Sequence, residues 1–177
     1  MENFTVPEVT ADDHVLGPSA APVTVLEYGD YECPFCRGAY RDVHRMLDLY
    51  PGSILFVFRN FPITQLHPHA EQAAEAAEAA AAQGKFWEMH DLLLANQENL
   101  KIMHLLRYAE GLELDQERLH DEIVNHVYAE KVSRDVESAD MSGVSGTPTF
   151  FINGQRHDGA FERDDLIEAI DARLTEG

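Results

Sequence analysis

Four consecutive residues, Cys33, Pro34, Phe35 and Cys36, place two thiols at a spacing that supports redox chemistry, and the chain holds no other cysteine. A disulfide that closes so short a loop removes little entropy from the unfolded chain, so the pair is poorly suited to stabilising a fold. Where such a pair opens a helix, the first sulfur faces backbone N–H groups and the positive end of the helix dipole, which favour the thiolate. The second sulfur, in the first helical turn, can attack a mixed disulfide and release the substrate. The pattern predicts Cys33 as the nucleophile and Cys36 as the resolving thiol, and Pro34 suits a helix start, where a missing N–H costs nothing.

The segments on either side of the pair predict a strand that leads into a helix. Residues 23–28 are apolar and β-branched, which predicts a buried strand, and Gly29 and Asp30 break it. From residue 36 to residue 49 the apolar side chains recur at intervals of three and four, which is helical spacing. Residues 54–58 predict a second strand that is covered on both faces. This order of elements indicates an α/β fold.

The middle of the chain is predicted to be helical, and a strand pattern resumes after it. Helices are expected over residues 70–83, 86–95, 100–109 and 116–141. Residues 149–154 then predict a strand that ends in the hairpin signal Asn153-Gly154, with residues 155–160 as its antiparallel partner. Residues 163–174 carry the apolar stripe of a closing amphipathic helix.

A run of helices between two strand regions predicts a helical subdomain inserted into an α/β domain. Residues 1–21 are polar and broken by proline and glycine, which predicts an arm that ends in a loop. The expected organisation is an N-terminal arm over residues 1–15, the α/β domain over residues 16–64 and 144–177, and the inserted helical subdomain over residues 65–143.

Charged residues surround the cysteines. Glu27 lies inside the first predicted strand, where an acid is out of place. An unpaired buried carboxyl is costly and tends to keep its proton near neutral pH, whereas at a strand edge the side chain would reach solvent. Asp30 and Glu32 disfavour a thiolate at Cys33, and Arg37 favours it. The direction of their net effect on the pKa of the Cys33 thiol is therefore open.

The motifs together resemble the bacterial DsbA-like thioredoxin-fold family over about residues 15–177. The resemblance is carried by Asp30-Tyr31-Glu32-Cys33-Pro34-Phe35-Cys36, Val15-Leu16-Gly17, His67-Pro68-His69-Ala70, Gly84-Lys85-Phe86-Trp87 and the stretch from Gly143 through Thr147-Pro148 to Gly154. It implies a thioredoxin-like fold with a central sheet and an inserted all-helical subdomain. It also implies a thiol-disulfide oxidoreductase that needs no bound cofactor.

The same resemblance implies roles for individual residues. Thr147 and Pro148 would be joined by a cis peptide bond facing the cysteines and would bind substrate together with Pro34 and Phe35. An acid at the place of Glu27 often relays a proton to the inner cysteine in thioredoxin-like proteins. Strongly oxidising members carry histidine where this chain has Phe35, so we expect a weaker oxidant here.

The two cysteines also allow other interpretations. A zinc site needs about four ligands, and His67 and His69, the only close histidine pair, lie in a separate segment, so no metal is expected. A peptide-binding or chaperone-like module with incidental cysteines is the main alternative function. A disulfide isomerase is disfavoured because only about twenty residues precede the first predicted strand. A glutathione-linked transferase is disfavoured because such proteins usually carry serine at the first cysteine position.

Composition limits the partners. The chain has 13 basic and 32 acidic residues and a net charge of −19, which argues against nucleic acid and against anionic membranes. We expect thiol or disulfide protein substrates, a redox recycling partner that the sequence does not name, and a monomer. No basic-then-apolar leader and no long apolar run occur, so a soluble, cytoplasmic protein is expected, or a periplasmic or exported one if a signal peptide has been removed.

Overall fold

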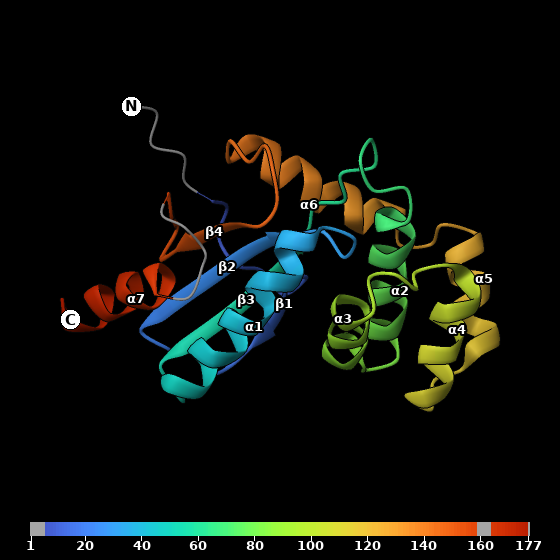
Figure 1. Cartoon of the computed structure of the whole chain (residues 1–177), viewed down its shortest axis with the longest axis horizontal. Helices are drawn as coiled ribbons and strands as arrows, with labels where there is room; N and C mark the ends of the chain where they lie inside the picture. Colours follow the sequence, from blue (N-terminus) through green and yellow to red (C-terminus); the bar gives the residue numbers. More distant parts are fainter. Residues whose placement is uncertain (1–5, 159–163, 177) are drawn as a thin grey trace. The chain divides into compact units, whose positions relative to one another are not determined.

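The computed structural model describes residues 6–158 and 164–176 of the chain (Figure 1). In this part, five strands form one sheet in the order β1-β3-β2-β4-β5. The strands are β1 (His14–Leu16), β2 (Val23–Gly29), β3 (Ile54–Asn60), β4 (Thr149–Ile152) and β5 (Gln155–Arg156). The helices are α1 (Pro34–Leu49), α2 (Ala70–Ala82), α3 (Phe86–Ala95), α4 (Ile102–Gly111), α5 (Gln116–Val124), α6 (Ala129–Met141) and α7 (Asp165–Thr175). The fold is therefore mixed α/β with one central sheet, as expected from the sequence.

The chain divides into two compact units, and the cysteine loop belongs to the helical one. Unit 1 comprises Met1–Gly29, Gly38–Arg59 and Glu137–Gly177, and holds the sheet with most of α1 and with α7. Unit 2 comprises Asp30–Arg37 and Asn60–Val136, and holds α2 to α5 with the first part of α6.

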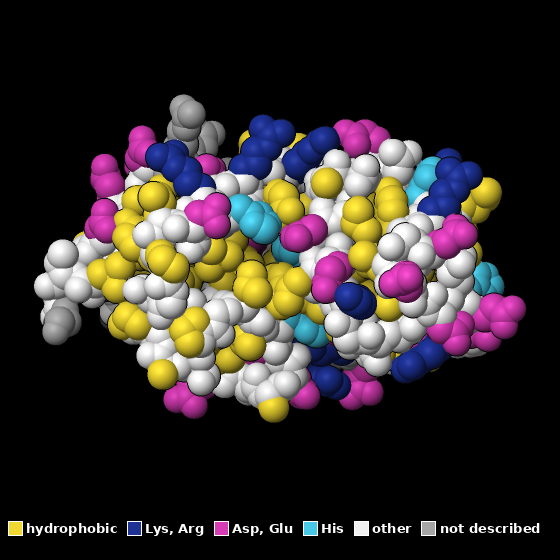
Figure 2. All heavy atoms as spheres, turned by 90° about the horizontal axis from the view of Figure 1, so that it is seen from below, with side chains coloured by type: hydrophobic (Ala, Val, Ile, Leu, Met, Phe, Trp, Pro, Cys, Tyr) yellow, Lys and Arg dark blue, Asp and Glu magenta, His cyan; other side chains and the backbone are white. Residues whose placement is uncertain are grey.

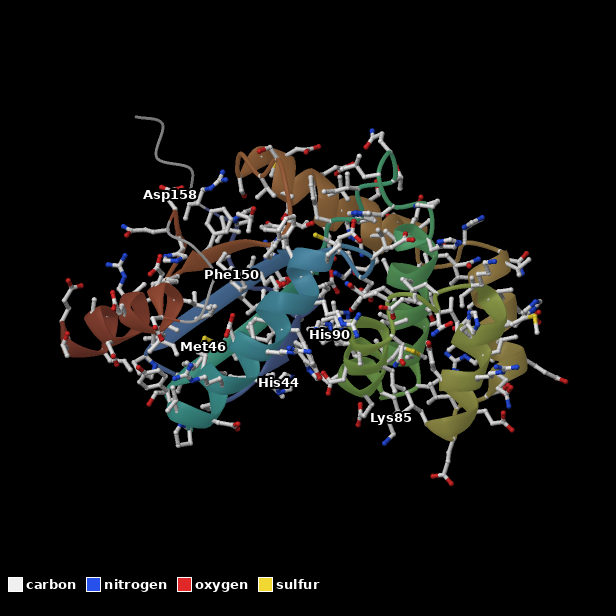
Figure 3. All side chains as sticks on the ribbon, in the orientation of Figure 1. His44, Met46, Lys85, His90, Phe150 and Asp158 are labelled. Atoms are coloured by element: carbon white, nitrogen blue, oxygen red, sulfur yellow. The ribbon has the colours of Figure 1, made fainter. Side chains whose placement is uncertain are left out.

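The core of unit 1 lies between the sheet and α1, which crosses one face of the strands (Figure 1). β2 and β3 are buried along nearly their whole length, as the apolar patterns predict for covered strands. Met46 of α1 and Phe150 of β4, both labelled in Figure 3, are among the fully buried side chains.

Two turns of unit 1 depend on the residue types that the sequence supplies. Asn153 and Gly154 both have positive φ, 47° and 79°, which fits the hairpin between β4 and β5. Gly17 has φ 105°, and a Cβ there would lie 2.2 Å from the carbonyl oxygen of Ile54, so only glycine lets the N-terminal segment pass this close to β3. The hairpin could be read from the sequence, but the close approach at Gly17 could not.

Two elements differ from the sequence-based expectation. Residues 14–16, predicted as part of an arm and loop, form the edge strand β1, in which Val15 pairs antiparallel with Val57 of β3. A three-residue strand has too short a pattern to be recognised, and its hydrogen bonds come from a distant segment. Residues 116–141, predicted as one helical segment, form α5 and α6 separated by a turn in which His126 has φ 53°, a conformation that cannot continue a right-handed helix.

Unit 2 is a helical bundle. α2 packs against α3, α4 and α5, and α4 also contacts α5. α2 is so rich in alanine that its neighbours approach closely, and nine of its thirteen residues are buried. The expected partner strand over residues 155–160 is described only as far as Asp158, and residues 159–163, where the last helix was predicted to begin, lie outside the described part.

Candidate active site

The cysteine pair lies at the start of α1. Cys33 immediately precedes the helix, and its carbonyl oxygen accepts the backbone N–H groups of Cys36 and Arg37 at 3.1 and 3.3 Å. The Cys33 side chain therefore lies at the N-terminus of the helix, where the dipole stabilises a thiolate. Cys33 is 4% exposed and Cys36 is fully buried, and the structure holds them as two thiols.

Pro34 and Phe35 form the exposed side of this loop. Both are solvent-accessible, and Phe35 is 63% exposed although it is a large apolar side chain. An exposed apolar ring in the cysteine loop is a surface on which another molecule can pack.

Asp30 organises the loop from within. Its backbone N–H donates to the sulfur of Cys36 at 3.4 Å, and its carbonyl oxygen accepts the N–H of Cys33 at 3.2 Å. Its fully buried carboxylate accepts the N–H groups of Glu32 and Ile63, each at 2.8 Å, and lies 2.8 Å from His67 Nδ1. The backbone of one residue therefore contacts both cysteines.

A second carboxylate–histidine pair flanks the same loop. Glu32 lies 2.9 Å from His69 Nδ1 and accepts the backbone N–H of His69 at 2.7 Å. His69 is the residue before α2, so the Glu32 carboxylate also lies at the positive end of that helix.

The turn between α3 and α4 contacts the other side of the loop. Gln97 Nε2 donates to the carbonyl oxygen of Cys33 at 2.7 Å. Arg37 donates to Glu98 at 2.7 Å and to the carbonyl oxygen of Ala95 at 3.3 Å. The Glu98 backbone N–H, and then the Arg37 guanidinium, hold the pKa of the Glu98 carboxyl below its ordinary value. The positive charge of Arg37 is therefore shared with Glu98 rather than directed only at the cysteines.

A buried aromatic pair lies behind the loop. Tyr31 Oη and His90 Nδ1 form a 3.0 Å hydrogen bond, and both residues are almost fully buried. His90, labelled on α3 in Figure 3, packs against the rings of Phe86 and Trp87. The aromatic cluster of α3 thus belongs to the core of unit 2 and anchors the residue two positions before Cys33.

The remaining predicted site residues belong to unit 1. Glu27 is 2% exposed on the central strand β2, so its side chain does not reach solvent at a strand edge. The peptide bond between Thr147 and Pro148 is cis. Thr149, the next residue, pairs with Tyr28 of β2, so Thr147 and Pro148 lie at the end of β2 from which the chain continues toward the cysteines.

Sequence reasoning gave His67, His69 and Gln97 no role in the site. The histidines do show one signal, which is their spacing. His67 and His69 are two residues apart, as are Asp30 and Glu32, so each acid lies 37 residues before the histidine that it contacts. No comparable signal marks Gln97. Within the described ranges, 6–158 and 164–176, no three His, Cys, Asp or Glu side chains converge in a way that would hold a metal ion.

Acidic side chains are spread over the visible face in Figure 2 rather than gathered in one patch. Among the described residues, no helix combines the length and the apolar character needed to span a bilayer.

A sheet flanked by helices, with a Cys-x-x-Cys pair where a strand leads into a helix, defines the thioredoxin-like class of proteins. The comparison with solved structures agrees. BdbD from Bacillus subtilis in its oxidised form superposes with a TM-score of 0.88 at 24% identity, covering 99% of this chain and 100% of that one. A thioredoxin-like oxidoreductase from Silicibacter pomeroyi has a TM-score of 0.82 at 31% identity, with 95% of each chain covered. Alpha-DsbA1 from Wolbachia pipientis has a TM-score of 0.82 at 23% identity, over 95% of this chain and 94% of that one.

The family assignment comes from the sequence match. Residues 9–172 match the thioredoxin family. The chain belongs to this family, in its DsbA-like group.

A curated relative places the domain in a different context from the one expected. The chain is 52% identical over 172 residues to a protein of Salinispora tropica named Na⁺/H⁺ antiporter NhaA 3, covering 97% of this chain and 26% of that protein. The chain therefore spans about a quarter of the length of such relatives. The antiport activity in that name belongs to the whole relative protein.

These relatives correct the predicted location. We expected a cytoplasmic protein from the lack of a leader and of an apolar span, but close relatives are named as Na⁺/H⁺ antiporters, so the cytoplasmic placement is wrong. The physical reason is that the composition of one stretch of about 170 residues carries no information about the parts of a longer protein that lie outside that stretch.

Proposed function

We propose that this chain exchanges disulfides with protein or small thiol substrates through Cys33 and Cys36. The observation that carries the proposal is the position of Cys33 directly before α1, with its carbonyl oxygen accepting the first helical hydrogen bonds. An oxidoreductase activity is also named for the 31% identical structure from Silicibacter pomeroyi.

The reductive direction proceeds in two steps. The Cys33 thiolate attacks one sulfur of a substrate disulfide, the substrate S–S bond breaks, and one substrate thiolate leaves and takes up a proton. Cys36 then loses its proton and attacks the Cys33 sulfur. A Cys33–Cys36 disulfide forms and the second substrate thiolate leaves. The same steps in reverse oxidise a substrate dithiol, and the motif does not select the direction.

Glu27 is proposed to accept the proton that Cys36 releases. Its burial on a central strand supports this role, because a carboxyl shielded from water exchanges protons with neighbouring groups rather than with solvent. This is the role that the family resemblance implies for Glu27.

Thr147 and Pro148, with Pro34 and Phe35, are proposed to bind the substrate chain. The exposure of Phe35 supports an apolar contact, and the partial exposure of Thr147 leaves its backbone accessible to an extended segment. A separate redox partner is proposed to recycle the cysteine pair after each exchange.

The first test is the reduction potential of the Cys33–Cys36 pair, measured by equilibrating the protein in glutathione buffers and trapping the thiols. A value near −120 mV would indicate a disulfide donor, and a value near −270 mV would indicate a reductant, by comparison with about −120 mV for DsbA and about −270 mV for thioredoxin. Phe35 supplies no charge or donor to the thiolate, so we expect a value well below that of DsbA. If Cys33 and Cys36 form no disulfide in any of the glutathione buffers, the proposal is refuted.

The second test separates exchange from chaperone-like binding. A Cys36→Ser variant should accumulate mixed disulfides at Cys33, because the resolving thiol is missing, and a Cys33→Ser variant should not. A double variant that still prevents aggregation of an unfolded client with wild-type efficiency would favour the peptide-binding alternative.

A further inference from the structure

Two histidines from one loop contact two carboxylates, those of Asp30 and Glu32, in the segment just before Cys33. His67 Nδ1 lies 2.8 Å from Asp30, and His69 Nδ1 lies 2.9 Å from Glu32. The side chains of His67 and His69 are 17% and 38% exposed, so both can exchange protons with solvent.

The two histidines are held by the backbone as well. His67 donates its N–H to the carbonyl oxygen of Ile63, whose own N–H donates to Asp30. His69 donates its N–H to Glu32, and its carbonyl oxygen accepts the N–H of Ala73 in α2. The loop and the cysteine segment are therefore joined by two backbone contacts and two side-chain contacts, and a change of charge at a histidine has little room to relax by movement.

The charge of this arrangement depends on the histidines. When both are neutral, two carboxylates stand beside Cys33 and disfavour a thiolate there. When both are protonated, each pair is neutral overall and this penalty is removed. Histidine side chains change charge between about pH 5 and pH 8, which is the range in which cells work.

We propose that His67 and His69 are positioning residues of the thiol site, which hold the side chains of Asp30 and Glu32 in the segment that leads to Cys33 and, when protonated, cancel their negative charge. Reactivity of Cys33 is thereby increased under mildly acidic conditions relative to a site with two uncompensated carboxylates. The inference deepens the proposed function and rests on Cys33 being the reacting thiol.

Other charged groups near the loop do not produce the same effect. Arg37, on α1, keeps its charge throughout and is paired with Glu98 from the α3–α4 turn. His90, on α3, is 3% exposed and hydrogen-bonded to Tyr31. Among the contacts described above for the loop, those of His67 and His69 join a solvent-accessible histidine to the carboxylate of Asp30 or Glu32.

The test measures the rate at which iodoacetamide alkylates Cys33 from pH 4 to pH 9, in a Cys36→Ala background that leaves a single thiol. In this reaction the thiolate sulfur displaces iodide and forms a thioether, so the rate reports the thiolate. The variants are His67→Gln, His69→Gln and both together, since glutamine can still donate to a carboxylate but cannot take up a proton. His120→Gln is the matched control, because His120 also contacts an aspartate, Asp121, but lies on α5.

The expected result is a pH-dependent ratio of rates. The parent protein should react about three- to tenfold faster than the double variant near pH 5 and equally fast near pH 8, as expected for two charges acting through a partly solvated site. His120→Gln should match the parent at every pH. A ratio that does not vary with pH would mean that the histidines only support the fold, and would overturn the inference.

Two checks keep the outcome interpretable. Fluorescence of Trp87, the single tryptophan, reports whether unit 2 is folded, and if the double variant is unfolded the half-exposed His69→Gln substitution alone decides the question. A parent Cys33 that reacts no faster at neutral pH than a free cysteine would instead refute the proposed function.

Discussion

Replacing Asp30 by asparagine is expected to destabilise unit 2, because no orientation of an amide satisfies the donors around this side chain. The carboxylate is fully buried and accepts hydrogen bonds from Glu32 N, Ile63 N and His67 Nδ1. An asparagine oxygen placed toward Ile63 and His67 leaves its NH₂ group facing the N–H of Glu32. The flipped amide loses the other two bonds instead.

The magnitude follows from counting these bonds. At least one charge-assisted hydrogen bond is lost, a buried N–H is left opposite a donor, and the remaining bonds lose their charge assistance. Each bond to a charged group contributes about 1.5–3 kcal/mol, and relief of the buried charge offsets part of the loss, so Asp30→Asn should cost about 2–4 kcal/mol. For a chain of this length, that lowers the Tm by about 5–15 °C.

Urea unfolding of the reduced protein, followed by the fluorescence of Trp87, measures this loss. Trp87 lies on α3 of the same unit and packs against His90, so its signal reports the unit that contains Asp30. Asp121→Asn is the matched control: it also alters an aspartate beside a histidine, but the Asp121 side chain is 77% exposed, and a change within about 0.5 kcal/mol is expected. A similarly small change for Asp30→Asn would show that the carboxylate does not hold the loop.

Three further substitutions test other buried groups. Lys131→Met leaves the buried carboxylate of Asp135 without its 2.6 Å partner, at a cost of about 3 kcal/mol at pH 7. Burial raises the pKa of Asp135, so the folded protein binds this proton more tightly than the unfolded chain, and the cost measured by urea unfolding should shrink as the pH falls toward 4. Arg59→Met removes the two hydrogen bonds of 2.8 and 2.9 Å that Arg59 donates to the buried Asp13 carboxylate, and should cost about 3–5 kcal/mol and expose the N-terminal segment to limited proteolysis. Glu27→Gln should slow the resolution of a Cys33 mixed disulfide about 10- to 100-fold in stopped-flow experiments.

Each of these predictions has a contrary outcome. A Lys131→Met effect that stays constant between pH 4 and pH 7 would mean that the Asp135 charge is not what the lysine stabilises. Wild-type protease resistance in Arg59→Met would show that the arginine does not anchor the N-terminal segment, although it also donates to the carbonyl oxygens of Pro7 and Glu8. An unchanged resolution rate in Glu27→Gln would remove that carboxyl from the mechanism.

The elements that carry the cysteines could be predicted because their signals are local. The β-branched run of residues 23–28 and the helical spacing after Cys36 gave β2 and α1, and Asn153-Gly154 gave the hairpin. Each of these depends on hydrogen bonds and side-chain periodicity within about ten residues. The spacing of the two thiols and their position at the start of a helix are also local properties of the sequence.

The surroundings of the thiols were decided by contacts between distant segments. The pairing of Asp30 with His67 and of Glu32 with His69 joins residues 37 positions apart, and the contact of Gln97 with Cys33 joins residues 64 apart. A single sequence contains the partners but not their pairing, because the pairing depends on how loops close and helices pack. The sequence by itself therefore pointed to the two thiols as the candidate reacting groups, and the tertiary structure determined which charged residues contact the loop that carries them.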